Sequence, residues 1–408
     1  MEFLKTGKRV FAIEDFIDRY RGFTSNGNLK VKLPNTIGRI VYKDIKTNID
    51  VPGFTRSTVD GYTCLSIQTT GSNPNSPIPF QYGGELKIGK VNGNNIDKKK
   101  VYYIPTGALL PIEFDSVIMI EDIKKSGNTI YFEKTIFKGE NVIFRGEDIK
   151  RGELIAKKGS VIRSVDIGVC ASQGIESIDI YKKVKVAIIP TGIELANPGE
   201  SIKESRIFDI NSYMLNSLFG NYSYIESDVF DIIMDDEKEL YEILKNNFDK
   251  YDLFIISGGS SKGIRDITIN VIKKLGSPGV LTHGLDISPG KPTILSLCNK
   301  KPIFGSPGHP VSSYISTRFV ILPIIKYIAG INKIYENNLR IVEIGEDIPS
   351  KPGIEHYYSI KLSDGLAYPI YSQSGMISSL CKADGIIVIP YDKEGLYKGE
   401  YVEYYSIK

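Results

Sequence analysis

A short apolar run that breaks into a loop of small residues restricts how residues 252–266 can fold. The four apolar residues 253–256 match a strand buried on both faces, and Ser257-Gly-Gly-Ser-Ser-Lys-Gly263 follows directly. Small residues let the backbone approach a ligand closely, and N–H groups at the start of a helix favour an anion. The pattern predicts a strand, an anion-binding loop and a helix. An ordinary strand-to-helix turn has the same composition and remains an alternative.

The same stretch carries charges of both signs. Lys262 and Arg265 are cations, and Asp266 places a carboxylate about one helical turn inside the predicted helix. An anion site that also holds an acid needs a cation to reconcile the two charges, most simply Mg²⁺. The residues of this loop that we predict to bind substrate are Ser257, Gly258, Gly259, Ser261 and Lys262.

Strand and helix patterns alternate from residue 184 to residue 329, which predicts a doubly wound α/β domain with a mostly parallel sheet. After Pro310 the pattern predicts a helix through Ile321. Ligands of such sheets bind at the carboxyl ends of the strands, so the loops at 191–194, 257–262 and 306–310 should lie together. The carboxylates best placed to hold Mg²⁺ there are Glu194, Asp235 and Asp266. Each also has an ordinary structural reading: a turn residue, a helix N-cap and a first-turn acid.

The rest of the chain shows mostly β patterns. Residues 11–20 predict a helix, and short alternating runs separated by Gly, Asn and Pro predict small β units before and after the α/β domain. The predicted units are a discontinuous N-terminal mixed linker domain at 1–50 and 141–180, an inserted β-rich domain at 51–140, the α/β domain at 181–330 and a C-terminal small β domain at 335–408.

Two further turns and one loop carry polar groups that can bind a ligand. Asp60 lies in a turn with Arg56, and Thr106 precedes a glycine in the predicted inserted domain. Both places are equally compatible with simple tight turns. Lys291 lies in Pro289-Gly-Lys-Pro292 and is also predicted to bind substrate.

The composition excludes several classes of function. The 51 Lys and Arg nearly balance the 48 Asp and Glu, which argues against nucleic acid as the main partner. Four scattered cysteines, read as packed thiols, and three histidines offer little material for a zinc site or a Cys/His dyad. The apolar region near 319–331 is interrupted by Pro323 and Lys326, so we expect no membrane span there and a cytoplasmic location.

Several short motifs occur in one order along nearly the whole chain. They are Arg56-Ser-Thr-Val-Asp-Gly-Tyr62, Thr106-Gly-Ala, Gly146-Glu-Asp, Thr191-Gly-Ile-Glu-Leu with Pro198-Gly-Glu, Ser257-Gly-Gly-Ser-Ser-Lys-Gly with Asp266, Pro289-Gly-Lys-Pro292 and Pro307-Gly-His-Pro-Val-Ser312. In this order they resemble the molybdopterin molybdenumtransferases, which comprise the MoeA proteins and the E domain of gephyrin. Each motif alone is weak, and the set in register is specific.

The resemblance implies an enzyme that inserts molybdate into adenylylated molybdopterin and, with Mg²⁺, releases AMP and the molybdenum cofactor. It implies that the α/β domain binds molybdopterin and that the protein is a homodimer whose site lies between subunits. The functional residues it implies are Asp60, Thr106, Glu194, Asp235 and Asp266, with Pro307 and Pro310 shaping a further loop. Asp60 would act across the dimer interface. A molybdopterin adenylyltransferase and cofactor-accepting apoenzymes are implied as partners.

The chain departs from the family pattern at four positions. Val59 replaces the usual Met, Ile193 an Asp, Ser288 a Lys and His309 an Asn. We expect the last three changes to surround a single pocket and to bear on the choice of oxyanion. Two alternatives therefore stay open: a tungstate-inserting enzyme, and a non-catalytic paralogue that binds molybdopterin or an oxyanion.

Overall fold

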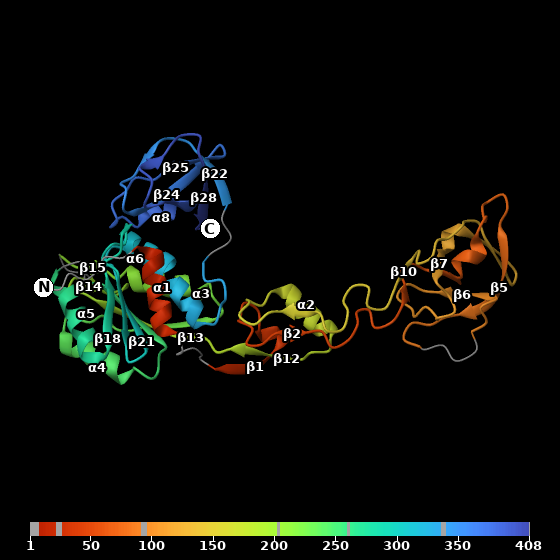
Figure 1. Ribbon diagram of the computed structural model, residues 1–408, viewed down its shortest axis with the longest axis horizontal. Coiled ribbons are helices and arrows are strands. Elements are labelled where there is room, and N and C mark those ends of the chain that lie inside the picture. The colour runs from red at the N-terminus through yellow and green to blue at the C-terminus, as the bar shows by residue number, and fades with distance from the viewer. Residues whose placement is uncertain are drawn as a thin grey trace.

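The computed structural model describes residues 8–21, 27–90, 96–201, 205–258, 262–335 and 340–407, without the side chains of residues 262–266. The molecule is elongated (Figure 1). The α/β unit and the C-terminal β unit lie together at one end, a small linker unit lies in the middle, and a β-rich unit lies at the other end. The predicted fold class is confirmed.

A six-stranded sheet forms the centre of the α/β unit. In spatial order its strands are β16 (Ile225–Val229), β13 (Val184–Thr191), β17 (Leu253–Gly258), β21 (Lys301–Ser306), β20 (Ile294–Cys298) and β18 (Pro278–His283). The first four are parallel, β20 pairs antiparallel with β21, and β18 pairs antiparallel with β20. Residues 253–257 of β17 are all buried, as the continuous apolar run predicts for a strand covered on both faces.

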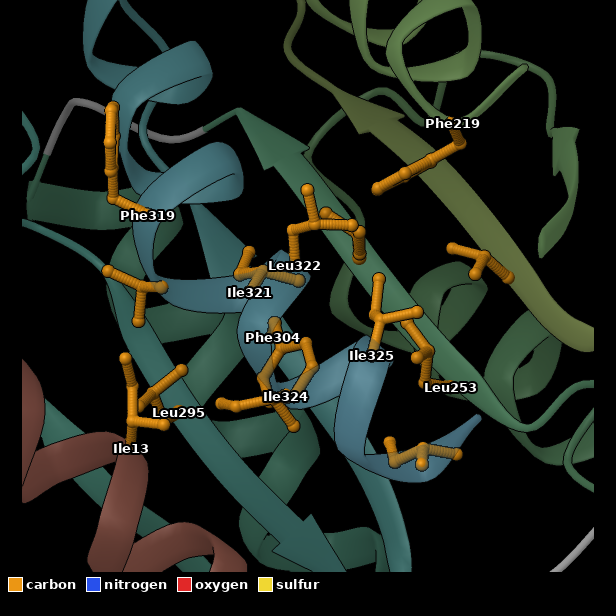
Figure 2. Close-up of a cluster of buried hydrophobic side chains, with 14 of the residues drawn as sticks. Ile13, Phe219, Leu253, Leu295, Phe304, Phe319, Ile321, Leu322, Ile324 and Ile325 are labelled. Atoms are coloured by element: carbon orange, nitrogen blue, oxygen red, sulfur yellow. The ribbon is translucent and has the colours of Figure 1, made fainter. Parts of the chain in front are cut away.

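Helices cover both faces of this sheet. They are α1 (Arg9–Tyr20), α3 (Asn211–Gly220), α4 (Glu237–Asn246), α5 (Lys262–Leu275), α6 (Pro310–Ser316) and α7 (Leu322–Ile328). Figure 2 shows Ile13 of α1 and Ile324 of α7 meeting Phe304 of the sheet in one buried cluster. The N-terminal helix thus packs on the α/β core. The domain boundaries given above stay a prediction.

The last helical region of the α/β unit is longer than the sequence indicates. We expected a helix through Ile321, and the structure continues it to Ile328 by way of a π-helical segment, Thr317–Ile321. A widened turn suits the approach to Pro323, which has no N–H to donate to the preceding turn. Among the described residues, Pro310–Ile328 is the one helix with the length and composition of a membrane span, and 83% of that stretch is buried inside the protein.

The β-rich unit at the far end is a second six-stranded sheet. Its strands are, in spatial order, β7 (Ser116–Met119), β4 (Gly61–Cys64), β6 (Lys100–Ile104), β5 (Ile78–Glu85), β9 (Thr129–Phe132) and β8 (Ile123–Ser126). The chain enters and leaves this unit side by side, because β3 (Arg56–Ser57) pairs with β10 (Val142–Ile143). Short 3₁₀ turns lie at Ser66–Thr69 and Ile120–Asp122.

The linker unit and the C-terminal unit complete the chain. The linker unit contains β1 (Asn28–Lys32) paired with β12 (Ser177–Tyr181), β2 (Ile45–Lys46) paired with β11 (Leu154–Ala156), α2 (Ser164–Ser172) and a 3₁₀ turn at Leu33–Asn35. The C-terminal sheet contains β24 (Glu355–Ser363), β25 (Leu366–Pro369), β22 (Arg340–Ile344), β28 (Tyr401–Ser406) and β26 (Gly385–Ile389), with β24 also pairing β26 to close the sheet. Smaller elements are β23 (Ile348–Pro349), β27 (Gly395–Leu396) and α8 (Ser378–Lys382).

Two details of the fold bear on function. The two-residue strand β19 (Ile287–Ser288) leaves the α/β unit and pairs in parallel with β24 of the C-terminal sheet, so one sheet spans both units. The cysteines are free thiols; Cys64, Cys170 and Cys298 are buried as predicted, whereas Cys381 is exposed, so the packed-thiol reading is wrong for that residue.

Candidate functional site

The carboxyl ends of three neighbouring strands bring the predicted loops together. Thr191 at the end of β13 is in register with Gly258 at the end of β17, and Ser257 is in register with Ser306 at the end of β21. The loops that begin at these residues therefore leave the same edge of the sheet. This is the edge at which open parallel sheets bind their ligands.

Gly258 is required by the close approach of β13. A Cβ atom built on Gly258 would lie 2.1 Å from the carbonyl oxygen of Thr191, and the residue has a φ of 143°. Only glycine meets both conditions without strain. The side chain of Ser257 is buried beside it. Gly259 and Ser261 lie outside the described residues, as do the side chains of Lys262 and Asp266, so those predictions stay predictions.

Glu194 and Asp235 form a pair of interacting acids at this edge. The chain segments that carry them are tied together, because Thr191 bridges to Ile233 and Gly192 N–H donates to Ile233 O at 3.0 Å. The carboxylate of Glu194 folds back over Gly192, where an added Cβ would lie 2.8 Å from Glu194 Oε2. Both acids are half-buried.

The environment of Asp235 disfavours its negative charge. Burial raises the pKa of Asp235, a hydrogen bond from the backbone of Ile193 opposes that rise, and the charge of Glu194 adds to it. Asp235 Oδ1 is buried and has no hydrogen-bond partner among the described residues. A buried carboxylate oxygen beside a second acid has the donor chemistry of a hard-cation ligand.

The neighbouring acid, Asp236, is the N-cap of α4, the structural role considered above for Asp235. Its Oδ1 accepts from Lys238 N–H at 2.8 Å and from Glu239 N–H at 3.1 Å, which makes Asp236 the N-cap of α4. Asp235 precedes the cap, with a φ of 52°. The N-cap reading of Asp235 is therefore wrong. Among the residues with described side chains, no group of three His, Cys, Asp or Glu residues is placed to hold a metal ion, and Asp266 lies outside that set.

A cavity of about 850 Å³ separates the α/β unit from the C-terminal unit. Its α/β wall is made of the Pro289–Pro292 and Pro307–Ser312 loops and includes Lys291 and Pro307. Pro310 is buried at the start of α6 rather than in the cavity lining. The opposite wall comes from β24 and from the loop 370–377 of the C-terminal unit, including Tyr358, Tyr371 and Ser374.

The charge character of this cavity is opposite to that of the Glu194–Asp235 pair. The described lining contains no Asp or Glu, and it includes Lys291, six serines and all three histidines of the chain, His283, His309 and His356. Burial lowers the pKa of His356, and the charge of Lys351 lowers it further. A pocket with cationic and hydroxyl groups but without carboxylates suits an anion.

Three departures from the family pattern, which we expected to surround one pocket, lie in different places. Ser288 and His309 line the cavity, whereas Ile193 is absent from its lining and lies exposed beside Glu194. The expectation of a single pocket is therefore wrong. Sequence reasoning also missed His283 and His356, whose only signal was the rarity of histidine in the chain, and Tyr358, which carried no signal. From the sequence, Ser372-Gln-Ser-Gly-Met376 could either reach a ligand or be an ordinary exposed loop, and its Ser372 and Ser374 line the cavity.

Asp60 and Thr106 are joined to each other by hydrogen bonds. Thr106 donates to Asp60 Oδ1 from its backbone N–H at 2.7 Å and from its hydroxyl at 3.1 Å. Both residues are exposed on the β-rich unit, at the opposite end of the molecule from β13 (Figure 1). Within one chain, Asp60 therefore lies beside Thr106 and Glu194 lies beside Asp235, but the two pairs are far from each other.

Comparisons with known proteins cover nearly the whole chain. Residues 11–174 match the MoeA N-terminal region (domain I and II), residues 187–327 match a family described as "Probable molybdopterin binding domain", and residues 342–407 match the MoeA C-terminal region (domain IV).

Full-length relatives share this arrangement. A candidate molybdopterin biosynthesis protein of Methanocaldococcus jannaschii is 32% identical over 93% of both chains. The molybdopterin molybdenumtransferase of Staphylococcus epidermidis is 26% identical over 92% of this chain and 90% of its own. The crystal structure of a MoeA molybdopterin biosynthesis protein from Pyrococcus horikoshii superimposes with a TM-score of 0.83 at 32% identity, covering 99% of this chain and all of the other.

Proposed function

The chain belongs to the MoeA family, and from this premise we propose that it is a molybdopterin molybdenumtransferase. The proposed reaction inserts molybdate into adenylylated molybdopterin and releases AMP and the molybdenum cofactor. The observation that carries the proposal is the division of charge at the carboxyl edge of the sheet: an acid pair follows β13, and the loop after β21 borders a large cavity whose described lining has no acid. A reaction that cleaves a phosphoanhydride while an oxyanion enters can use a cation-binding site for the first and an anion-binding site for the second.

The acid pair fits Mg²⁺ as the metal of the proposal. Asp235 has a buried oxygen without a partner among the described residues, and Glu194 places a second carboxylate against it. Asp266 is the predicted third acid. Bound Mg²⁺ would neutralise negative charge on the phosphate oxygens. The protein residues hold the cation and orient the adenylate, and backbone N–H groups of the loop after β17 would bind the phosphate.

The cavity is the proposed site of the molybdate substrate. Lys291 supplies a positive charge, and Gly290, Gly308 and Ser312 supply N–H and hydroxyl donors. The absence of carboxylates from the described lining removes repulsion of the dianion. Tungstate has the same charge and accepts hydrogen bonds from the same kinds of donor, so it is the alternative oxyanion.

The proposed active form is a homodimer. Asp60 and Thr106 belong to the β-rich unit, which lies at the other end of the molecule from the α/β unit that carries Glu194. A second copy placing its β-rich unit against the α/β edge would bring the Asp60 carboxylate, fixed by the two Thr106 hydrogen bonds, to the acid pair. The proposal also includes a cytoplasmic location, supply of the adenylate by a molybdopterin adenylyltransferase, and delivery of the product to cofactor-dependent apoenzymes.

The test is AMP release from adenylylated molybdopterin with Mg²⁺ and either molybdate or tungstate. We expect release by the unaltered protein and a loss of roughly 100-fold or more in Glu194→Gln, because a metal-ligating charge is removed. Glu200→Gln is the matched control, since Glu200 is an exposed acid six residues along the chain whose carboxylate accepts from Asn197 Nδ2 at 2.8 Å. Binding of the adenylate without AMP release would support the non-catalytic alternative. Equal activity of the two variants would exclude the assigned site.

A further inference from the structure

The C-terminal unit is attached to the α/β unit on one side of the cavity by partly buried contacts. β19 pairs with β24 through Ile287↔Glu355 and Ser288↔His356, and Glu355 N–H donates to Asp286 O at 2.9 Å. The carboxylate of Glu355 also forms an ion pair with Arg9 at 2.7 Å. These contacts fix the base of the cavity firmly.

On the other side of the cavity, Ser374 of the loop 370–377 makes hydrogen bonds to the α/β unit. The loop 370–377 is largely exposed, and Ser374 is its half-buried midpoint. Ser374 O accepts from Val311 N–H at 3.1 Å, and Ser374 Oγ lies 2.8 Å from His309 Nδ1. Within the described part of the chain, these are the hydrogen bonds that join the loop to the α/β unit.

His309 has a position in the fold that explains this contact. It is the residue before α6, where side chains commonly cap the helix, yet its ring makes no capping hydrogen bond. The ring turns instead to Ser374, whose carbonyl satisfies the N–H of Val311 in the first turn of α6. The side-chain contact and the backbone contact thus hold the same loop residue from two directions.

We propose that His309 and Ser374 form a clasp that holds the loop 370–377 across the cavity and so retains the oxyanion. His309 is a positioning residue in this account, because it acts through the loop rather than on the reacting atoms. The inference rests on the proposed function only for the identity of the ligand. The clasp itself is a property of the free protein.

The experiment compares His309→Ala, Ser374→Ala and the double variant in two assays. The first is hydrogen exchange of the loop 371–377 and of Val311 N–H in the free protein. The second separates KM for molybdate from kcat in AMP release. Ser378→Ala is the matched control, since Ser378 is an exposed serine four residues along the chain and outside the cavity lining. Ser374→Thr keeps the hydroxyl.

We expect each alanine variant at the clasp to speed loop exchange and to raise KM by roughly three- to tenfold, the effect of one net hydrogen bond, with kcat nearly unchanged. The double variant should match the singles, because either substitution breaks the same contact, and Ser374→Thr should resemble the unaltered protein. Additive effects, or a Ser374→Ala variant that behaves like Ser378→Ala, would overturn the clasp. If the unaltered protein releases no AMP, the proposed function fails, and loop exchange alone decides the clasp.

Discussion

Substitution of Gly258 by alanine tests whether the strand end at the proposed phosphate site is as tightly built as its geometry indicates. The new Cβ would lie 2.1 Å from Thr191 O and 2.6 Å from Thr191 Oγ1, whereas ordinary contact begins at 3.4 Å. Backbone strain at a φ of 143° costs about 1–3 kcal/mol, and forced separation of packed groups costs about 1–3 kcal/mol more. We expect β13 and β17 to lose about 2–6 kcal/mol of stability.

The measurement is the free energy of opening from hydrogen exchange of the β13 and β17 amides. Gly199→Ala is the matched control, because Gly199 also has a positive φ, 94°, but an added Cβ there meets no atom within 4 Å. The control carries the strain without the collision, so Gly258→Ala should weaken the two strands clearly more. Equal effects of the two substitutions on β13 and β17 would refute the argument that close backbone approach selects glycine at this site.

Three further predictions concern charges. Asp235→Asn should abolish most AMP release while Asp236→Asn keeps it, since Asn still caps α4; activity assays of this adjacent pair decide which acid serves the site. The pKa of Asp235 is raised in the folded protein, so protonated Asp235 stabilises the fold. This contribution is lost as the pH rises from the ordinary pKa of 3.8 through the raised pKa of the folded state. Denaturation measured across that pH window should show the loss of stability, and the loss should be smaller in Asp235→Asn or with Mg²⁺. Arg9→Ala should destabilise the attachment of the C-terminal unit by about 3 kcal/mol, because the half-buried Glu355 loses its cation and keeps the hydrogen bond from the Tyr357 hydroxyl at 2.9 Å. Exchange of β19 and β24 amides should rise, and unchanged exchange would contradict the structural role of the pair.

The α/β unit was predictable from the sequence because its strands are continuous apolar runs. The run 253–256 lies within β17, and the loops after β13, β17 and β21 leave one edge as the strand-end argument requires. The choice between Asp235 and Asp236 as helix cap was beyond the sequence. Both acids suit a cap, and only the backbone conformation decides which one faces the helix.

The cavity was beyond sequence reasoning for a topological reason. It depends on β19, a strand of only two residues, pairing with β24, and no periodicity marks so short an element. His356 and Ser374 reach the site only because that pairing places the C-terminal unit over the α/β unit. The helix beyond Ile321 was underestimated because Pro323 normally ends a helix, and here a π-helical turn accommodates it.

Mixing two inactive variants tests most directly whether one site draws on two copies of the chain. Asp60→Asn and Glu194→Gln proteins are each expected to be inactive in AMP release. After subunit exchange, a mixed dimer contains one site with both acids intact. Random pairing of equal amounts should therefore restore about one quarter of the unaltered activity. A mixture that stays as inactive as its components, with subunit exchange verified, would contradict the shared site.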